Sequence, residues 1–369
     1  MIKVSLVTTT INYPKLLIEY AKDFLKFNKK KNIELIIIIA GDIKTPNKTK
    51  KLADTITNKY KIKCEYLDKK KQNKYLQHFK NLKKFLPWNS VQRRNVAILK
   101  SFHEKCDLII TIDDDNFLKT KNFVQSHLFN VKKTRGMIVK SSSNWFNICQ
   151  FLNENNNNNF FHRGFPISKK KLKNNYKLSN KKNFKIAANA GLWLNDPDVD
   201  AITRLSQKIK VNSYKLKKNF HLGPKIWSPF NSQNTALIGE SIPAYFLSPH
   251  VGRMDDIYAS YIYKKICDHL RFNISYGYPL VRQDRNDHNI WNDLDLEKNY
   301  HYFLEDFLNI LEEIKIDKKN NNFYSATINL INKLETKINK KNFEPKKLKC
   351  FKYFIKGYKI WLQSIKKIR

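Results

Sequence analysis

The alternation of strand-like and helix-like segments in the first third of the chain constrains its fold most strongly. The strand-like runs are Ile2–Thr9, Glu34–Ala40, Cys64–Leu67 and Leu108–Ile112, and the helix-like runs are Pro14–Phe27, Leu52–Tyr60 and Val91–Lys105. Such alternation predicts a doubly wound parallel sheet, in which ligands bind at the carboxyl ends of the strands. We therefore expect polar residues from three strand ends to share one edge of the sheet: Thr8–Thr10, Asp42 and Asp113–Asp115.

Three consecutive aspartates, Asp113, Asp114 and Asp115, follow the apolar strand Leu108–Ile112. Alternate side chains of an extended segment point the same way, so Asp113 and Asp115 are expected to converge while Asp114 faces elsewhere. Two carboxylates suit Mg²⁺ or Mn²⁺, and such an ion would in turn hold a diphosphate. A solvated turn with helix-capping aspartates is the alternative interpretation.

Four further polar positions are candidates for the same site. Asp42 is suited to accept hydrogen bonds from a nucleobase or ribose, or is an ordinary turn residue. Asp255 and Asp256, beside Arg253, would position sugar hydroxyls or supply a general base, or else cap a helix that begins there. His288 is a candidate third metal ligand or phosphate contact, with a structural role as the alternative.

The chain carries 70 lysines and arginines against 32 aspartates and glutamates, a formal charge of +38. This charge favours an anionic partner, although a Lys- and Asn-rich composition from an AT-rich coding sequence would also produce it. No helix-turn-helix, zinc-finger or RNP signature is evident, so no nucleic-acid partner is expected. The five cysteines are scattered and form no C-x-x-C pair, and no leader or membrane-spanning run is evident, which together predict a cytoplasmic protein.

The basic segment 346–369 has the spacing of an amphipathic helix. Its apolar face would comprise Phe354, Ile355, Tyr358, Trp361, Leu362 and Ile365. Most amphipathic helices pack such a face on their own domain. Aromatic residues flanked by lysines also suit a helix that lies peripherally on an anionic membrane, so both interpretations stay open.

Several blocks resemble one family in the same order along the chain, between about Val4 and Pro279. The blocks are Thr111–Asp115 (TIDDD), Phe161–Ser168 (FHRGFPIS), Ala190–Asp198 (AGLWLNDPD), Gly252–Ala259 (GRMDDIYA) and Ile266–Leu270 (ICDHL). They are similar to motifs of the reversibly glycosylated polypeptides, also called UDP-arabinopyranose mutases. The resemblance implies a GT-A-like α/β fold with a mixed, Rossmann-type sheet flanked by helices.

The resemblance also implies roles for individual residues. Asp113, Asp115 and His288 would hold Mn²⁺ or Mg²⁺, and Arg163 matches the arginine that becomes glycosylated. The set expected to bind the nucleotide sugar, a UDP-sugar, is Thr8, Thr9, Asp42, Arg94, Asp114, Asn189, Trp193, Asn234 and Arg253.

We therefore expect a catalytic domain at 1–300 and a helical, basic extension at 301–369. Two reactions fit: interconversion of the pyranose and furanose forms of a UDP-sugar, with self-glycosylation at Arg163, or transfer of the sugar to an external glycan or lipid-linked acceptor. Arg163, Asp255 and Asp256 are the candidate catalytic residues, with Asp255 or Asp256 as the base in the transfer reaction. The sequence departs from the family pattern at 230–237 and 282–285, so both reactions stay open. A homo-oligomer is compatible with either.

Overall fold

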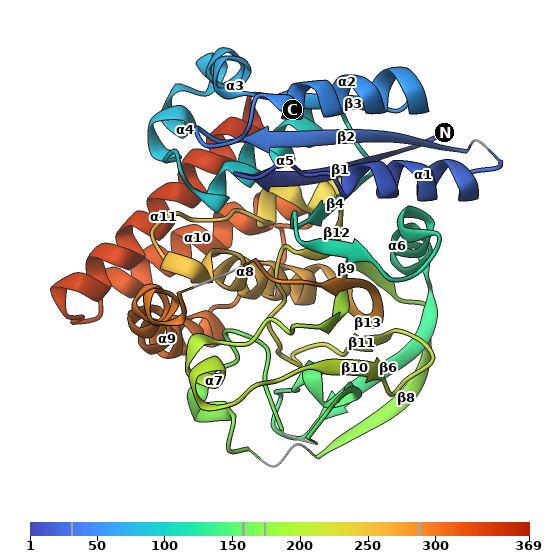
Figure 1. Ribbon diagram of the computed structural model, residues 1–369. Helices are drawn as coiled ribbons and strands as arrows, with labels where there is room; N and C mark the ends of the chain where they lie inside the picture. Colours follow the sequence, from blue (N-terminus) through green and yellow to red (C-terminus); the bar gives the residue numbers. More distant parts are fainter. Residues whose placement is uncertain (31, 157–158, 173–174, 287–288) are drawn as a thin grey trace.

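One large mixed sheet organises the molecule (Figure 1). The computed structural model describes residues 1–30, 32–156, 159–172, 175–286 and 289–369. From one edge to the other, the main path of the sheet runs β3 (Lys63–Leu67), β2 (Ile33–Gly41), β1 (Ile2–Thr10), β4 (Leu108–Ile112), β12 (Asn234–Ile238), β9 (Lys185–Asn195), β13 (Phe272–Gln283), β11 (Phe220–Leu222), β6 (Arg135–Ser141) and β8 (Tyr176–Lys182). Shorter strands pair beside this path: β5 (Asn116–Leu118), β7 (Leu152–Glu154) and β10 (Val211–Tyr214).

Helices cover the sheet and form a separate layer at the C-terminal end of the chain. They are α1 (Leu17–Phe27), α2 (Lys48–Tyr60), α3 (Lys69–Tyr75), α4 (Lys80–Phe85), α5 (Arg94–His103), α6 (Phe123–Lys132), α7 (Ala201–Ser206), α8 (Asp255–Leu270), α9 (Ile290–Glu313), α10 (Phe323–Asn339) and α11 (Pro345–Lys366). Helix α1 contacts α2 and α6, whereas α5 lies against β1 and β2 and α8 lies against β13. None of the described helices is long and apolar enough to cross a membrane.

The N-terminal part of the sheet confirms the expected βα alternation. Strands β3, β2, β1 and β4 are neighbours in this order, and each neighbouring pair is parallel. Every residue of β2 except Glu34 is buried, as expected for a parallel strand that is covered on both faces. Because the strands are parallel, the residues that follow β1, β2 and β4 meet at one edge of the sheet.

The second part of the sheet is mixed, so the doubly wound parallel sheet predicted from the alternation alone is wrong there. Strand β12 is antiparallel to both β4 and β9, with Thr235 opposite Thr111 and Ala190. The chain enters β12 through the irregular segment 223–233, which contains no helix. The alternation of strands and helices on which the prediction rests therefore ends before β12. The mixed α/β sheet implied by the family resemblance is confirmed.

The C-terminal helices pack on the sheet domain and lie together on one side of the molecule (Figure 1). The six apolar residues predicted to share one face of the last helix are all buried in α11. The indole nitrogen of Trp361 donates to the Ile242 carbonyl at 3.1 Å, and its ring lies 5.5 Å from that of Phe246. The apolar face is therefore covered by the protein itself, which corrects the alternative in which it inserts into a membrane. The boundary expected at residue 300 falls inside α9.

Candidate functional site

A cavity of about 500 Å³ lies where β1, β2 and β4 end. Its described lining includes seven aspartates and four arginines, although the chain as a whole is strongly basic. The charged lining residues are Asp42, Asp113, Asp114, Asp115, Asp198, Asp255, Asp256, Arg94, Arg163, Arg253 and Arg285. They come from segments far apart in the sequence, so the tertiary fold builds the site.

Asp42 borders the cavity at the end of β2 and holds the loop that forms the adjacent wall. Its Oδ1 accepts the backbone N–H of Asn89 at 2.8 Å, and its Oδ2 accepts that of Ser90 at 2.9 Å. Both carboxylate oxygens are thus engaged in shaping the wall. A contact with a nucleobase or ribose would have to use the remaining lone pairs.

All three consecutive aspartates line the cavity, so the expectation that Asp114 faces away is wrong. The reason is local: the strand ends at Ile112, and Asp114 and Asp115 belong to a turn in which the alternation of side chains no longer holds. Asp113 forms an ion pair with the guanidinium of Arg94, and Asp114 accepts the hydroxyl of Thr10. Burial raises the pKa of the Asp114 carboxyl.

Asp115 is the aspartate of this run whose charge is least compensated. Burial raises its pKa to about 6, and the neighbouring charges of Asp113 and Asp114 add to the effect. Among the described residues, its Oδ2 accepts a long hydrogen bond of 3.5 Å from Gln283, and its Oδ1 accepts one of 3.1 Å from Asn116. A divalent cation between Asp113 and Asp115 would supply the missing positive charge, and carboxylate oxygens are the ligands that Mg²⁺ and Mn²⁺ prefer. The donor set therefore fits such an ion.

The protein supplies few metal ligands in the described ranges. No group of three or more histidine, cysteine, aspartate or glutamate side chains suited to a metal ion is found among the described residues. His288, the expected third ligand, lies outside those residues. Phosphate oxygens and water would complete the coordination of an ion held by two carboxylates, as is common for Mg²⁺.

Arg163 lies at the wall of the cavity, between the carboxylates of Asp198 and Asp256. Its Nε is 2.9 Å from Asp198 Oδ1, and its Nη2 is 3.1 Å from both Asp198 Oδ2 and Asp256 Oδ1. Its Nη1 donates to the backbone carbonyl of Arg253. Burial opposes the charged form, but the charges of Asp198 and Asp256 outweigh it and raise the pKa of Arg163. The guanidinium is therefore firmly protonated in this state.

The adjacent residues Asp255 and Asp256 have different environments at the start of α8. Asp256 is engaged by Arg163 and by the backbone N–H of Ser232 at 3.0 Å. Asp255 accepts a side-chain hydrogen bond of 2.9 Å from Gln92. Burial, followed by the charge of Asp256, raises the pKa of Asp255 to about 7. Asp255 can consequently gain and lose a proton near neutral pH, which a general base must do.

Arg253 connects the cavity to the helical extension. Its guanidinium forms ion pairs with two largely buried carboxylates of α9, Asp293 and Glu297, the latter at 3.3 Å. Since its backbone carbonyl also accepts from Arg163, α9 helps to fix both arginines. The helix that spans the expected domain boundary is thus part of the site.

Four of the residues expected to bind the nucleotide sugar are not among those that line the cavity. Asn189 and Asn234 both hydrogen-bond to the buried imidazole of His127, at 2.9 and 3.0 Å. Trp193 is fully buried beside His162, and Thr8 is buried within β1. These side chains are held in the interior, whereas Thr9, Asp42, Arg94, Asp114 and Arg253 do line the cavity.

Several lining residues were not singled out from the sequence: Asp198, Ser232, Gln233, Gln283 and Arg285. Thr10, which was expected at this edge of the sheet, also lines the cavity. Gln283 ends strand β13, so the rule that ligands bind at strand ends could have found it. Asp198, Ser232 and Gln233 lie in irregular segments, where no periodicity indicates the direction of a side chain.

The fold and the cavity define an α/β protein whose ligand site lies at the carboxyl ends of its parallel strands. A family model for the reversibly glycosylated polypeptides matches residues 104–367, well over half of the chain. The chain belongs to this family, as its sequence motifs predict.

Curated relatives agree with this placement. An Arabidopsis thaliana protein named probable UDP-arabinopyranose mutase 4 is 24% identical over 244 residues, covering 63% of this chain and 62% of that protein. UDP-arabinopyranose mutase 1 of Oryza sativa is 25% identical over 246 residues, covering 63% and 62%. The chain thus matches less than two thirds of the length of these relatives.

Among solved structures, Staphylococcus aureus TarS 1–349 with UDP-GlcNAc aligns with a TM-score of 0.36 at 10% identity, over 100% of this chain and 91% of that one. The mannosyltransferase PcManGT from Pyrobaculum calidifontis, with GDP-Man and Mn²⁺, aligns with a TM-score of 0.37 at 8% identity, over 99% and 86%.

Proposed function

We propose that this protein is a nucleotide-sugar enzyme that binds a UDP-sugar with a divalent cation and breaks the bond between the anomeric carbon and the diphosphate. The observation that carries the proposal is the convergence of Asp113–Asp115, Arg163 and Asp255 on one cavity at the strand ends. The names of the relatives support a UDP-sugar as the substrate.

The environment of each charged residue in the cavity indicates the role that it would have in this reaction. Asp113 and Asp115 would hold Mn²⁺ or Mg²⁺, and a bound ion stabilises the charge that develops on the departing diphosphate. Arg94 holds Asp113 in place, because its guanidinium is buried and paired with that carboxylate. Arg163 presents positive charge near the reacting sugar and is fixed by Asp198 and Asp256.

In the mutase reaction, the anomeric bond to UDP breaks, the sugar re-forms with the other ring size, and UDP recaptures it. The relatives' names favour this reaction. Self-glycosylation at Arg163 would require the guanidinium to lose a proton before a C–N bond forms, and Asp256 at 3.1 Å is placed to accept that proton. The tight ion pairs around Arg163 oppose this loss in the state described.

Transfer to an external acceptor is the second candidate, and the environment of Asp255 favours it. A carboxylate with a pKa near 7 can take the proton of an attacking hydroxyl at physiological pH. A glycan or a lipid-linked sugar would supply that hydroxyl. Asp256 is less suited to this role, because Arg163 and Ser232 already engage it.

Incubation of the pure protein with a panel of UDP-sugars and Mn²⁺, followed by chromatography and by mass spectrometry of the protein, tests the proposal. A ring-isomerised UDP-sugar, with or without a sugar adduct on Arg163, supports the mutase. Release of UDP only when an acceptor is added, with no adduct, supports the transferase. If no UDP-sugar is consumed and none stabilises the protein against heat in the presence of Mn²⁺, the proposal is wrong.

A further inference from the structure

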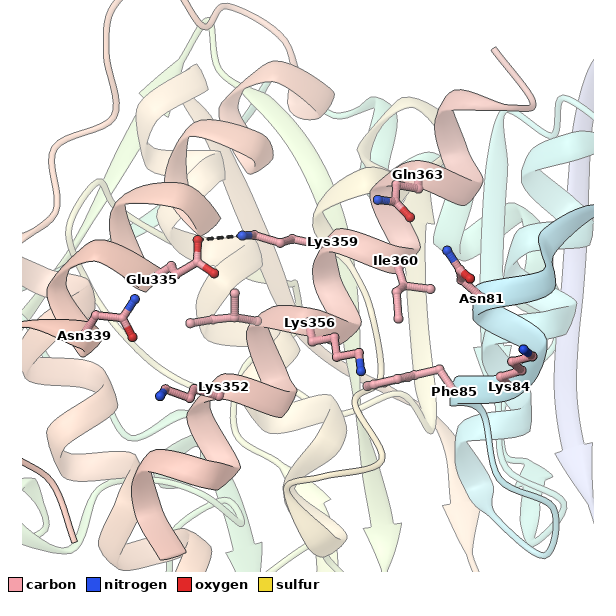
Figure 2. Close-up of a pocket in the computed structure, with 11 residues that line it drawn as sticks. Asn81, Lys84, Phe85, Glu335, Asn339, Lys352, Lys356, Lys359, Ile360 and Gln363 are labelled. Carbon is pink, nitrogen blue, oxygen red and sulfur yellow. Dashed lines mark hydrogen bonds and ion pairs between the residues drawn. The ribbon is translucent and has the colours of Figure 1, made fainter. Parts of the chain in front are cut away.

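A second hollow lies between helices α4, α10 and α11 (Figure 2). We call it the helical groove; its volume is about 730 Å³. It is lined by Asn81, Lys84, Phe85, Glu335, Asn339, Lys352, Ile355, Lys356, Lys359, Ile360 and Gln363. None of these residues lines the cavity at the strand ends, so the helical groove is a separate feature.

The helical groove carries uncompensated positive charge. Lys84, Lys352 and Lys356 form no ion pair with any carboxylate in the described part of the chain. The carboxylate of the lining, Glu335, is paired with Lys359 at 2.6 Å, as the dashed line in Figure 2 shows. Charge complementarity therefore calls for an acidic occupant that places its carboxylates near the three unpaired lysines.

The groove also offers apolar surface in a fixed position. Phe85 of α4, which is half-buried, supplies most of this surface, because Ile355 and Ile360 of α11 are only 2% and 9% exposed. Gly357 allows this close approach of the two helices, because a Cβ atom there would lie 2.8 Å from the ring of Phe85. The packing of α4 against α11 fixes the shape of the groove, which lowers the cost of binding a ligand there.

Amide side chains complete the lining and distinguish between classes of anion. Asn81, Asn339 and Gln363 are exposed, and each amide can both donate and accept a hydrogen bond. A peptide backbone needs partners of both kinds, whereas the phosphates of a membrane surface or a nucleic acid only accept. A concave groove is also poorly matched to a flat bilayer, and the apolar face of α11 is already buried.

We propose that the helical groove is a docking site for an acidic peptide segment of another protein, with aspartates or glutamates interleaved with apolar residues. The apolar side chains would lie on Phe85, and the carboxylates would pair with Lys84, Lys352 and Lys356. A second copy of this chain has 70 basic against 32 acidic residues, so an acidic segment of another protein matches the groove better. The inference is independent of the proposed enzymatic activity.

Selection of random displayed peptides on the full-length protein tests the proposal. Enriched peptides are resynthesised with a fluorescent label, and their affinities are measured by anisotropy for three proteins: the wild type, Lys352→Gln/Lys356→Gln, and the control Lys346→Gln/Lys349→Gln. The control pair is exposed on the same helix, outside the groove, and removes the same charge. All four lysines are exposed, so both variants should fold.

We expect acidic peptides that contain apolar residues to be enriched. They should bind the groove variant about tenfold more weakly than the wild type, which corresponds to about 1.4 kcal/mol, and should bind the control variant as well as the wild type. Failure to enrich acidic peptides, or equal affinity for all three proteins, would overturn the proposal. So would groove-dependent binding of phosphatidylserine vesicles or single-stranded RNA without groove-dependent binding of a peptide.

Discussion

Replacing Asp255 by asparagine should stabilise the folded protein above neutral pH while removing activity. Burial and the charge of Asp256 raise the pKa of Asp255 from its usual 3.8 to about 7. Between these two values the folded state holds a proton that the unfolded state has lost. Stability therefore falls as the pH rises through this window, and the loss is complete above pH 7.

The size of this effect follows from the shift in pKa. A shift of about 3 units, at about 1.4 kcal/mol per unit, sets a ceiling of about 4 kcal/mol for the cost of ionising Asp255 in the folded protein. Asparagine cannot ionise and still presents a carbonyl oxygen to Gln92, which donates to Asp255 at 2.9 Å. We expect Asp255→Asn to raise the free energy of unfolding by about 2 kcal/mol at pH 8 and to change it little at pH 4.

Urea denaturation of the wild type and the variant between pH 4 and pH 8, without nucleotide or metal, measures this difference. The neighbouring variant Asp256→Asn is the matched control, because it removes a charged partner of the buried Arg163. That change should destabilise the protein by about 3 kcal/mol at neutral pH. If the stability of Asp255→Asn and of the wild type depended on pH in the same way, our reasoning about Asp255 would be refuted.

The metal site, Arg163 and the last helix provide four further predictions. Asp115→Asn should remove most of the metal-dependent binding of UDP in calorimetry, and unchanged affinity would exclude Asp115 as a ligand. Since the pKa of Asp115 is about 6 and its proton must leave before a cation binds, the affinity for Mn²⁺ should fall about tenfold per pH unit below pH 6; a flat titration between pH 5 and 7 would contradict this. Arg163→Lys should abolish turnover and lower the free energy of unfolding by about 3 kcal/mol, because an ammonium cannot bridge Asp198 and Asp256 as the guanidinium does; retained turnover would argue against this role. Trp361→Ala should cost about 3 to 5 kcal/mol in chemical denaturation, and a loss below 1 kcal/mol would show that α11 is loosely docked.

The sequence allowed the parallel half of the fold and its acidic edge to be predicted, because those features depend on local patterns. An apolar run with β-branched residues marks β4, and the position of Asp113–Asp115 after it places them at the strand end. The direction of β12 could not be predicted, since it depends on how the chain crosses the sheet. The apolar face of α11 was predicted, but only tertiary contacts such as that between Trp361 and Ile242 decide what covers it.

Within the site, local patterns predicted which residue types gather but not how they pair. The adjacent residues Asp255 and Asp256 are equivalent in sequence terms. The structure separates them because Arg163, about ninety positions away, reaches only Asp256. The polar residues Asn189 and Asn234 lie in conspicuous motifs, yet their hydrogen bonds to His127 belong to the buried interior of the sheet.

The cavity has an acidic lining although the protein as a whole is basic, so an anion meets charges of opposite sign far from the cavity and inside it. A charge of +38 draws any polyanion toward the surface, and this attraction weakens as ionic strength rises. Inside the cavity, seven aspartates against four arginines reverse the local field. We therefore expect a diphosphate without a bound cation to approach the protein faster but to be repelled by the aspartates inside the cavity. A diphosphate whose charge is neutralised by a divalent cation should be repelled far less. The rate at which the diphosphate compound associates with the protein should thus depend chiefly on salt concentration. The lifetime of the bound complex should depend chiefly on whether the cation is removed by a chelator.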